Sequence, residues 1–218
     1  MPKYIILFFI CCVPVLCRGQ IRGNFAGAEL ELGASVFTDD HIRDVFPVGI
    51  HFSGGPLWTF DTSENFFIKG VLGIKWYMHD LPDGYLEHLG TIRIGPEFAY
   101  RTFSTDYFAL IPTLKIDFAW CTNFDTEGGL GEALQDEPAY VLSERYMRGW
   151  GIGKEVGLKA LFRDKWFIRL SYEWLNPRFK VLNSELQGDL GKDYMNRQHK
   201  SLNLNTINLT MGINLNRI

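Results

Sequence analysis

The segment Trp166–Trp174 reads WFIRLSYEW, and it indicates most directly how this chain folds. Its apolar residues fall on every second position, and the positions between them include Arg169, Ser171 and Glu173. Successive side chains of a β-strand point to opposite faces, so this period of two predicts a strand with one apolar and one polar face. Its length matches the roughly nine residues that a tilted strand needs to cross a bilayer.

The same alternation recurs in seven further segments. The eight predicted strands are 27–37, 48–60, 66–77, 89–101, 107–120, 151–162, 166–175 and 206–215. Short turns at 61–65, around 104–106 and at 163–165 alternate with long loops at 38–47, 78–88, 121–150 and 176–205. Bacterial membrane barrels show this pattern, with short periplasmic turns and long extracellular loops. An even number of strands places both chain ends on the turn side.

Alternation alone does not say which face lies outside, because soluble lipocalin-like barrels alternate with their apolar face inside. Aromatic residues near the predicted strand ends favour the membrane arrangement, since such rings suit the headgroup layer. Glycines recur on the polar face, where small side chains make room in a narrow lumen. The predicted aromatic girdle consists of Trp58, Phe60, Trp76, Trp120, Trp166 and Trp174.

The polar face carries acids and bases in near balance, as a buried and ion-paired interior requires. An eight-stranded barrel is only wide enough for side chains to fill, so we expect a plug and no solute pore. The predicted lumen ion-pair network consists of Glu29, Glu31, Lys69, Lys75, Arg93, Glu97, Arg101, Lys115, Asp117, Glu155, Lys159, Arg169 and Glu173.

With these features the sequence resembles small outer-membrane β-barrel proteins of the OmpA/OmpX type, in particular the PorT-like outer membrane beta-barrel group. The resemblance covers about residues 25–218 and rests on the strand pattern, the loop asymmetry, WFIRLSYEW and INLTMGINL (207–215). It implies an all-β fold, a single eight-stranded antiparallel up-and-down transmembrane β-barrel in the bacterial outer membrane. Such barrels usually end on an aromatic residue, whereas this chain ends Asn216-Arg217-Ile218.

The first residues have the features of an export signal. Lys3 precedes the apolar run 4–16, and Cys17-Arg18-Gly19 places small residues before a cut at Gln20. We therefore expect a cleaved signal peptide at 1–19 and one barrel domain at 20–218. A membrane anchor would need a longer run, and a lipoprotein signal acylated at Cys17 would need a small residue at position 16.

Cleavage would leave Cys121 as the only cysteine, so the sequence predicts no internal disulfide. The whole chain has a formal net charge of −3, and removal of the signal makes it more negative. This balance gives no support for nucleic-acid binding.

The leading functional hypothesis is a non-enzymatic structural or interaction barrel that acts through its extracellular loops. Its expected partners are outer-membrane lipid, lipopolysaccharide and an unidentified protein at the long loops, and we expect a monomer without cofactor or metal. Two alternatives are a lipid A-modifying, deacylase-like hydrolase and a soluble lipocalin-like lipid carrier.

The hydrolase alternative rests on His199-Lys200-Ser201, a His-x-Ser pair just before the last predicted strand. The chemistry needs a histidine base, a serine nucleophile and an acid that orients the histidine. No Asp or Glu follows Asp193, and Leu202 stands where the deacylase pattern has Asn directly after Ser. The sequence therefore favours an inactive loop pair.

Acidic residues cluster in three of the long loops, and oxygen-rich clusters can hold Ca²⁺ or Mg²⁺. None has the spacing of an EF-hand loop, so solvated loop charge is the favoured interpretation. These residues are Asp39, Asp40, Asp44, Asp80, Asp83, Glu87, Asp125, Glu127, Glu132, Asp136 and Glu137.

Overall fold

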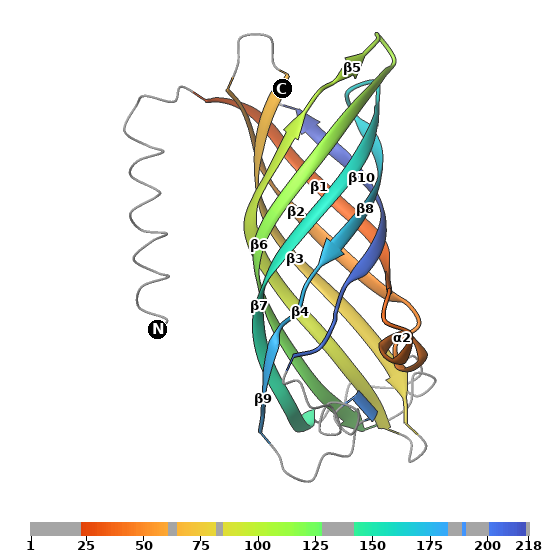
Figure 1. Cartoon of the computed structure of the whole chain (residues 1–218). Helices are drawn as coiled ribbons and strands as arrows, with labels where there is room; N and C mark the ends of the chain where they lie inside the picture. Colours follow the sequence, from red (N-terminus) through yellow and green to blue (C-terminus); the bar gives the residue numbers. More distant parts are fainter. Residues whose placement is uncertain are drawn as a thin grey trace.

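The structure, a computed structural model, describes residues 23–60, 65–81, 85–127, 142–182, 189–190 and 201–216. Figure 1 shows a single tall barrel with one short helix beside one of its ends. The elements are β1 (Asn24–Phe37), α2 (Asp40–Val45), β2 (Gly49–Thr59), β3 (Phe66–Asp80), β4 (Tyr85–Tyr100), β5 (Phe103–Ser104), β6 (Phe108–Glu127), β7 (Leu142–Phe162), β8 (Trp166–Trp174), β9 (Arg178–Val181) and β10 (Thr206–Asn216). None of the described helices is long and apolar enough to cross a membrane.

Eight strands close into a ring in the order β1-β2-β3-β4-β6-β7-β8-β10, and every neighbouring pair is antiparallel. The predicted eight-stranded up-and-down barrel is therefore confirmed. The short strand β5 pairs with β6, and β9 continues the line of β8 along β7 after an interruption at Pro177. We call the end with the short turns the turn end and the opposite end the loop end.

The register fixes the tilt of the barrel. Following paired residues around the ring from Phe37 leads back to the same strand at Gly27, a displacement of ten residues. With about 3.3 Å per residue and about 4.8 Å between strands, this displacement sets a strand tilt of roughly 40°. That tilt is typical of small membrane barrels.

The apolar face of the ring lies outside. Ile92 and Leu170 are 57% and 59% exposed, whereas the inward-facing Arg93 and Glu173 are 3% and 1% exposed. A soluble lipid carrier needs the reverse arrangement, so the structure contradicts the lipocalin-like alternative.

The apolar exterior has the height of a membrane barrel. Trp166 and Trp174 lie eight residues apart on β8, which is about 20 Å along the barrel axis at this rise and tilt. Outer-membrane barrels carry an apolar band about 25 Å tall between two aromatic girdles. The exterior therefore fits the hydrocarbon layer of a bilayer.

The predicted loop 121–150 is wrong in part. β6 continues to Glu127 and β7 begins at Leu142, so the hairpin extends well beyond the predicted strand ends. Beyond the lipid, neither face of a strand has to be apolar, and the alternation that reveals a strand in the sequence disappears. The predicted loop 38–47 likewise contains α2, whose N-cap Asp39 accepts a hydrogen bond from the N–H of Ile42.

Candidate functional site

Among the described residues, the ion-pair network of the lumen contains six acids and six bases, contributed by six of the eight ring strands. The turn-end cluster contains Glu29, Glu31, Lys69, Glu97, Lys159 and Arg169. The loop-end cluster contains Lys75, Arg93, Lys115, Asp117, Glu155 and Glu173. Each cluster has three acids and three bases, so each is neutral in its fully ionised form.

The turn-end cluster is centred on Lys69. Its Nζ lies 2.9 Å from Glu29 Oε2 and 3.1 Å from Glu97 Oε1, and it also contacts Glu31. The guanidinium of Arg169 lies 2.5 Å from Glu97 and 2.6 Å from Glu31. Three carboxylates are thus held together by cations placed between them.

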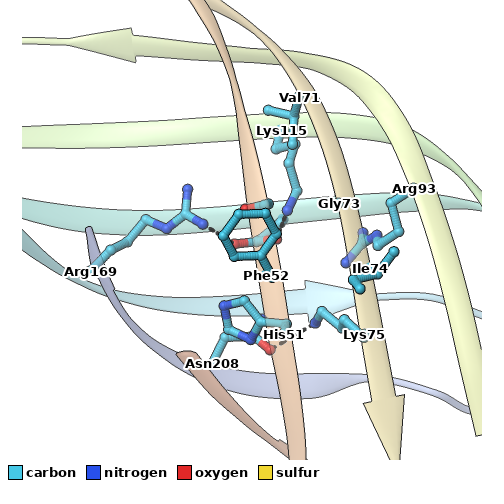
Figure 2. Close-up of a pocket in the computed structure, with 12 residues that line it drawn as sticks. His51, Phe52, Val71, Gly73, Ile74, Lys75, Arg93, Lys115, Arg169 and Asn208 are labelled. Atoms are coloured by element: carbon cyan, nitrogen blue, oxygen red, sulfur yellow. Dashed lines mark hydrogen bonds and ion pairs between the residues drawn. The ribbon is translucent and has the colours of Figure 1, made fainter. Parts of the chain in front are cut away.

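The loop-end cluster is centred on Arg93. Its guanidinium lies 2.5 Å from Glu173 Oε2 and 2.7 Å from Asp117, while Lys75 Nζ lies 2.5 Å from Glu173. Lys115 Nζ lies 3.8 Å from Asp117 on the same strand. Figure 2 shows Lys75, Arg93 and Lys115 directed into the lumen from their strands.

Arg169 also joins the two clusters, because its guanidinium lies 3.6 Å from Glu155, the partner of Lys115. The network is therefore continuous across the lumen. A cavity of about 20 Å³ remains beside His51 and Asn208, which is room for about one water molecule. His51 itself is hydrogen-bonded to Ser35 and Thr210, both at 2.9 Å.

The three glutamates of the turn-end cluster also have the geometry of a cation site. Carboxylate oxygens of Glu29, Glu31 and Glu97 lie within 4.8 Å of one another. The ammonium group of Lys69 contacts all three side chains, and it supplies the positive charge that a metal ion would supply there. The group is therefore better described as part of an ion-pair network.

Arg101 lies outside the network to which the sequence assigned it. Its guanidinium lies 3.2 Å from Asp164 at the turn end, where both side chains are accessible to water. Arg101 lies four residues after Glu97, so the alternation directs both side chains inward. Arg101 lies beyond the end of β4, however, where the lumen is open. Position along the axis, which the alternation does not report, decides its partner.

The turn end of the lumen is hollow. A cavity of about 530 Å³ is lined by side chains that include Thr59, Phe67 and Arg101. It ends at the pair of Glu29 and Lys159, whose charged atoms lie 2.8 Å apart. Solvent that enters from the turn end therefore meets the first ion pairs of the turn-end cluster.

Gly153 makes room for one of these ion pairs. A Cβ at this position would lie 2.2 Å from Asp117 Oδ1 and 2.5 Å from an Arg93 nitrogen. We expect Gly153→Ala to displace the pair and to lower the free energy of unfolding by about 1–3 kcal/mol, as overpacking does. Denaturant unfolding in lipid vesicles, followed by tryptophan fluorescence, measures this change.

Gly90→Ala is the matched control for this prediction. A Cβ at Gly90 would meet its nearest neighbour, Trp76, at an ordinary 3.7 Å. The control should therefore change the unfolding free energy by no more than about 0.5 kcal/mol. Equal effects of the two substitutions would show that Gly153 has no special role beside Arg93.

The loop end of the lumen is closed by apolar side chains, which we call the loop-end plug. It includes Ile42 of α2, the C-cap residue Phe46, and Leu190, Leu202 and Leu204. Its buried members are Phe37, Ile42, Phe46, Tyr77, Leu89, Ala119, Cys121, Tyr146, Met147, Leu175, Phe179, Leu190, Leu202 and Leu204. The alternation does not predict this plug as a whole, because strand residues such as Tyr77 and Leu89 meet residues outside the strands, such as Ile42 and Leu202.

Glu87, on β4, links the loop-end plug to the barrel wall through hydrogen bonds. Its carboxylate accepts hydrogen bonds from the backbone N–H of Asp189 at 2.8 Å and of Leu190 at 3.3 Å, and from Asn123 Nδ2 at 2.8 Å. Burial raises the pKa of the Glu87 carboxyl, and these three donors oppose the rise. This acid has a structural role that its place in an acidic loop did not indicate.

Other acids of the predicted loop clusters also have local partners. Asp40 pairs with Arg43 in α2, and Asp125 accepts a hydrogen bond from the Tyr146 hydroxyl at 2.5 Å. Among the described residues these acids do not converge on a cation site. Asp83, Glu132, Asp136 and Glu137 lie outside the described residues, and the side chain of Glu127 is not described.

Most of the predicted girdle residues lie on the outer surface of the barrel, although Trp120 lies well inside β6. Trp76, Trp120, Trp166 and Trp174 are exposed. The half-buried Trp58 packs edge-to-face with Phe25, with ring centroids 6.5 Å apart. Phe60 lies one residue beyond the end of β2 and packs on Phe66.

Trp150 belongs to the same outer surface and was missed. It is exposed and stacks on Phe118, with ring centroids 5.8 Å apart. The predicted strand began at residue 151, one position too late to include it. Trp150 lies two residues before the outward-facing Ile152, so the alternation places both on the same face, and this spacing could have identified it.

Of the His-x-Ser pair on which the hydrolase alternative rests, His199 lies outside the described residues. Ser201 is half-buried and forms an isolated β-bridge with Arg178 at the loop end. The predicted signal peptide at 1–19 also lies outside the described part of the chain.

No protein-family model matches the sequence, and a search of curated proteins found no match. Solved structures with a similar fold include the N-terminal β-barrel domain of Pseudomonas aeruginosa OprF. It is 14% identical, with 89% of this chain and 100% of that chain covered and a TM-score of 0.46. Another is Ail, the attachment invasion locus protein of Yersinia pestis, solved with the heparin analogue sucrose octasulfate. It is 10% identical, with 88% and 99% covered and a TM-score of 0.45.

A major outer membrane protein from Thermus thermophilus is 11% identical, with 85% and 98% covered and a TM-score of 0.45. All three likenesses concern the fold alone. The chain's own closed ring, apolar exterior and ion-paired lumen satisfy the requirements that lipid places on a spanning sheet. From these features of the chain itself, its fold is a closed eight-stranded antiparallel β-barrel of the kind that spans outer membranes.

Proposed function

We propose that this protein is a non-enzymatic barrel of the bacterial outer membrane that acts from the cell surface through its loop end. The observation that carries the proposal is the double closure of the lumen. The ion-pair network fills its middle, and the loop-end plug covers its outer mouth. A barrel closed in this way offers neither a solute path nor an open lumenal site at its outer mouth.

The loop end is the part of the molecule that is built to reach outward. β6 continues for seven residues beyond the girdle residue Trp120, which carries the hairpin of β6 and β7 roughly 15–20 Å further along the axis. α2 lies at the same end, and its outer side is exposed at Asp44. A rigid scaffold that presents such loops is a common arrangement for recognition.

We further propose that the protein is a monomer whose membrane partners are outer-membrane lipid and lipopolysaccharide and whose protein partner binds at the loop end. The closed ring supports a monomer, because no ring strand has a free edge to pair with another chain.

A conductance measurement and a labelling measurement test the proposal together. In planar bilayers we expect no steady ion conductance above the background of the bilayer. In a Cys121→Ala background, a membrane-impermeant maleimide should label Asp44→Cys on intact cells. It should label Thr105→Cys, an exposed turn-end position, only after the cells are broken.

Two results would contradict the proposal. Steady conductance through the folded barrel would show that the lumen is a pore. Labelling of Thr105→Cys on intact cells, with Asp44→Cys protected, would show that the loop end faces the periplasm.

A further inference from the structure

The outer surface of β7 and β9 carries three exposed cations near the loop end, which we call the outer basic row. They are Arg148 on β7 and Arg178 and Lys180 on β9. In Figure 1, β9 lies along β7 at the end of the barrel that carries α2. The inward-facing Phe179, between the two cations of β9, is buried in the loop-end plug.

Strand pairing brings these cations close together. Arg148 lies directly opposite Lys180, and Trp150 lies directly opposite Arg178. Directly opposed residues of an antiparallel pair have Cβ atoms about 5 Å apart, and like charges in such positions repel one another. A cluster of this kind is unfavourable unless an anion lies between its members.

The described part of the chain supplies no such anion. Each cation of the two lumen clusters has a carboxylate within 4 Å, whereas none of the three cations of the outer basic row has one among the described residues. The outward-facing side chains described on β6, β7, β8 and β9 include no acid. Like charges thus lie together here without a neutralising acid among the described residues, and such an unfavourable local arrangement is typical of a functional site.

The position of the row relative to the girdle indicates which anion it would meet. Arg178 lies level with Trp150 in the pairing, and Arg148 and Lys180 lie two residues further toward the loop end. Tryptophan rings mark the interface of the bilayer, so the cations stand at the height of the lipid headgroups. Below them, the outward-facing Ile152 begins the apolar surface against which acyl chains can pack.

A fourth cation faces the same strip of lipid at the edge of the apolar band. Lys154 points outward on β7 between Ile116 and Trp174, its paired neighbours on β6 and β8. A lysine there is unfavourable unless its long stem carries the ammonium toward the interface. That direction leads toward the outer basic row.

From this arrangement we infer that the outer basic row is a binding site for a phosphorylated glycolipid of the outer leaflet, with the chemistry of lipid A. The guanidinium groups of Arg148 and Arg178 and the ammonium group of Lys180 bind the headgroup phosphates. Arginine matches phosphate oxygens with two parallel hydrogen bonds, and lysine contributes a positive charge. The apolar band below takes the acyl chains. The inference rests on the proposed function insofar as it needs the loop end in the outer leaflet.

Native mass spectrometry of the refolded chain in detergent micelles tests this site. We expect the protein to retain bisphosphorylated lipid A at least tenfold more than dephosphorylated lipid A. The triple variant Arg148→Gln/Arg178→Gln/Lys180→Gln should lose that preference by at least tenfold. The charge-retaining variant Arg148→Lys/Arg178→Lys should lose less of it than the triple variant, because lysine keeps the charge but not the paired hydrogen bonds.

Arg163→Gln/Lys165→Gln, which removes two exposed cations at the turn end, is the matched control and should bind as the unchanged protein does. If the triple variant fails to fold, the single variant Lys180→Gln should still show a reduced preference.

Equal retention by the triple variant, equal binding of dephosphorylated lipid, or full displacement by an excess of inorganic phosphate would overturn the inference. A folded, heat-modifiable barrel without this preference would refute the lipid site alone, whereas failure to fractionate with the outer membrane would refute the proposed function.

Discussion

Arg169→Met is expected to destabilise the barrel more than any other single substitution considered for this protein. The guanidinium of Arg169 contacts Glu31, Glu97 and Glu155 and joins the two lumen clusters. Its removal leaves three carboxylates but only two lysines in the turn-end cluster, so one buried negative charge is uncompensated. Breaking a buried ion pair in this way costs about 3–5 kcal/mol. Urea unfolding in lipid vesicles, followed by tryptophan fluorescence and by migration on unheated gels, measures the loss.

Two companion variants identify the cause. Arg169→Lys keeps the charge but loses the forked geometry, so its effect should be smaller than that of Arg169→Met. Adding Glu97→Gln to Arg169→Met should recover part of the stability, because one uncompensated charge is removed. If the double variant were less stable than Arg169→Met by the full effect of Glu97→Gln alone, the two residues would not be coupled and the network described here would be wrong.

Leu170→Arg is expected to produce the second largest effect. Leu170 is an outward-facing residue midway between Trp166 and Trp174 on β8, so its side chain lies near the middle of the apolar band. An arginine on the lipid face near the midplane of the bilayer costs about 2–4 kcal/mol. The same vesicle unfolding measurement reports this loss, together with a lower folded yield on refolding into lipid.

The depth dependence of this penalty supplies the control. Lys180 faces outward at the loop end, so replacing it with Arg keeps a cation at the interface and should have almost no effect on stability. Leu170→Ala separates the loss of apolar area from the introduction of charge, and it should cost less than Leu170→Arg. A neutral effect of Leu170→Arg would mean that this face meets water and that the chain is no membrane barrel.

These two substitutions probe opposite faces of one strand, since Arg169 and Leu170 are neighbours on β8. One side of the strand requires charge because its partners are buried carboxylates, and the other excludes charge because it meets lipid. We propose that recognition takes place at the loop end, where the plug, α2 and the long hairpin lie.

The membrane-spanning part of the fold could be predicted closely from the sequence. Six of the eight ring strands begin and end within about four residues of their predicted limits, and the outward-facing apolar residues agree with the predicted face. The reason is local, because each strand meets lipid on one side and a charged lumen on the other. In WFIRLSYEW the apolar positions correspond to the lipid side, and Arg169, Ser171 and Glu173 correspond to the lumen side.

The loop end could not be predicted in the same way. The extensions of β6 and β7 have no lipid to meet and show no useful alternation, so they appeared as loop. The core also takes in Ile42 of α2, Leu190, Leu202 and Leu204 through contacts distant in sequence. Glu87 appeared as one acid in an acidic loop, although its role depends on backbone N–H groups a hundred residues further along the chain.

The sequence by itself determined the strands, their two faces, and a nearly balanced set of charges directed inward. The tertiary structure alone decided which charges meet, because closing the ring with a displacement of ten residues sets the height of each side chain along the axis. That closure brings Lys69 to three glutamates and leaves Arg101 at the rim. The pairing of β9 with β7 likewise places Arg148 opposite Lys180, and only this placement makes three scattered cations one surface.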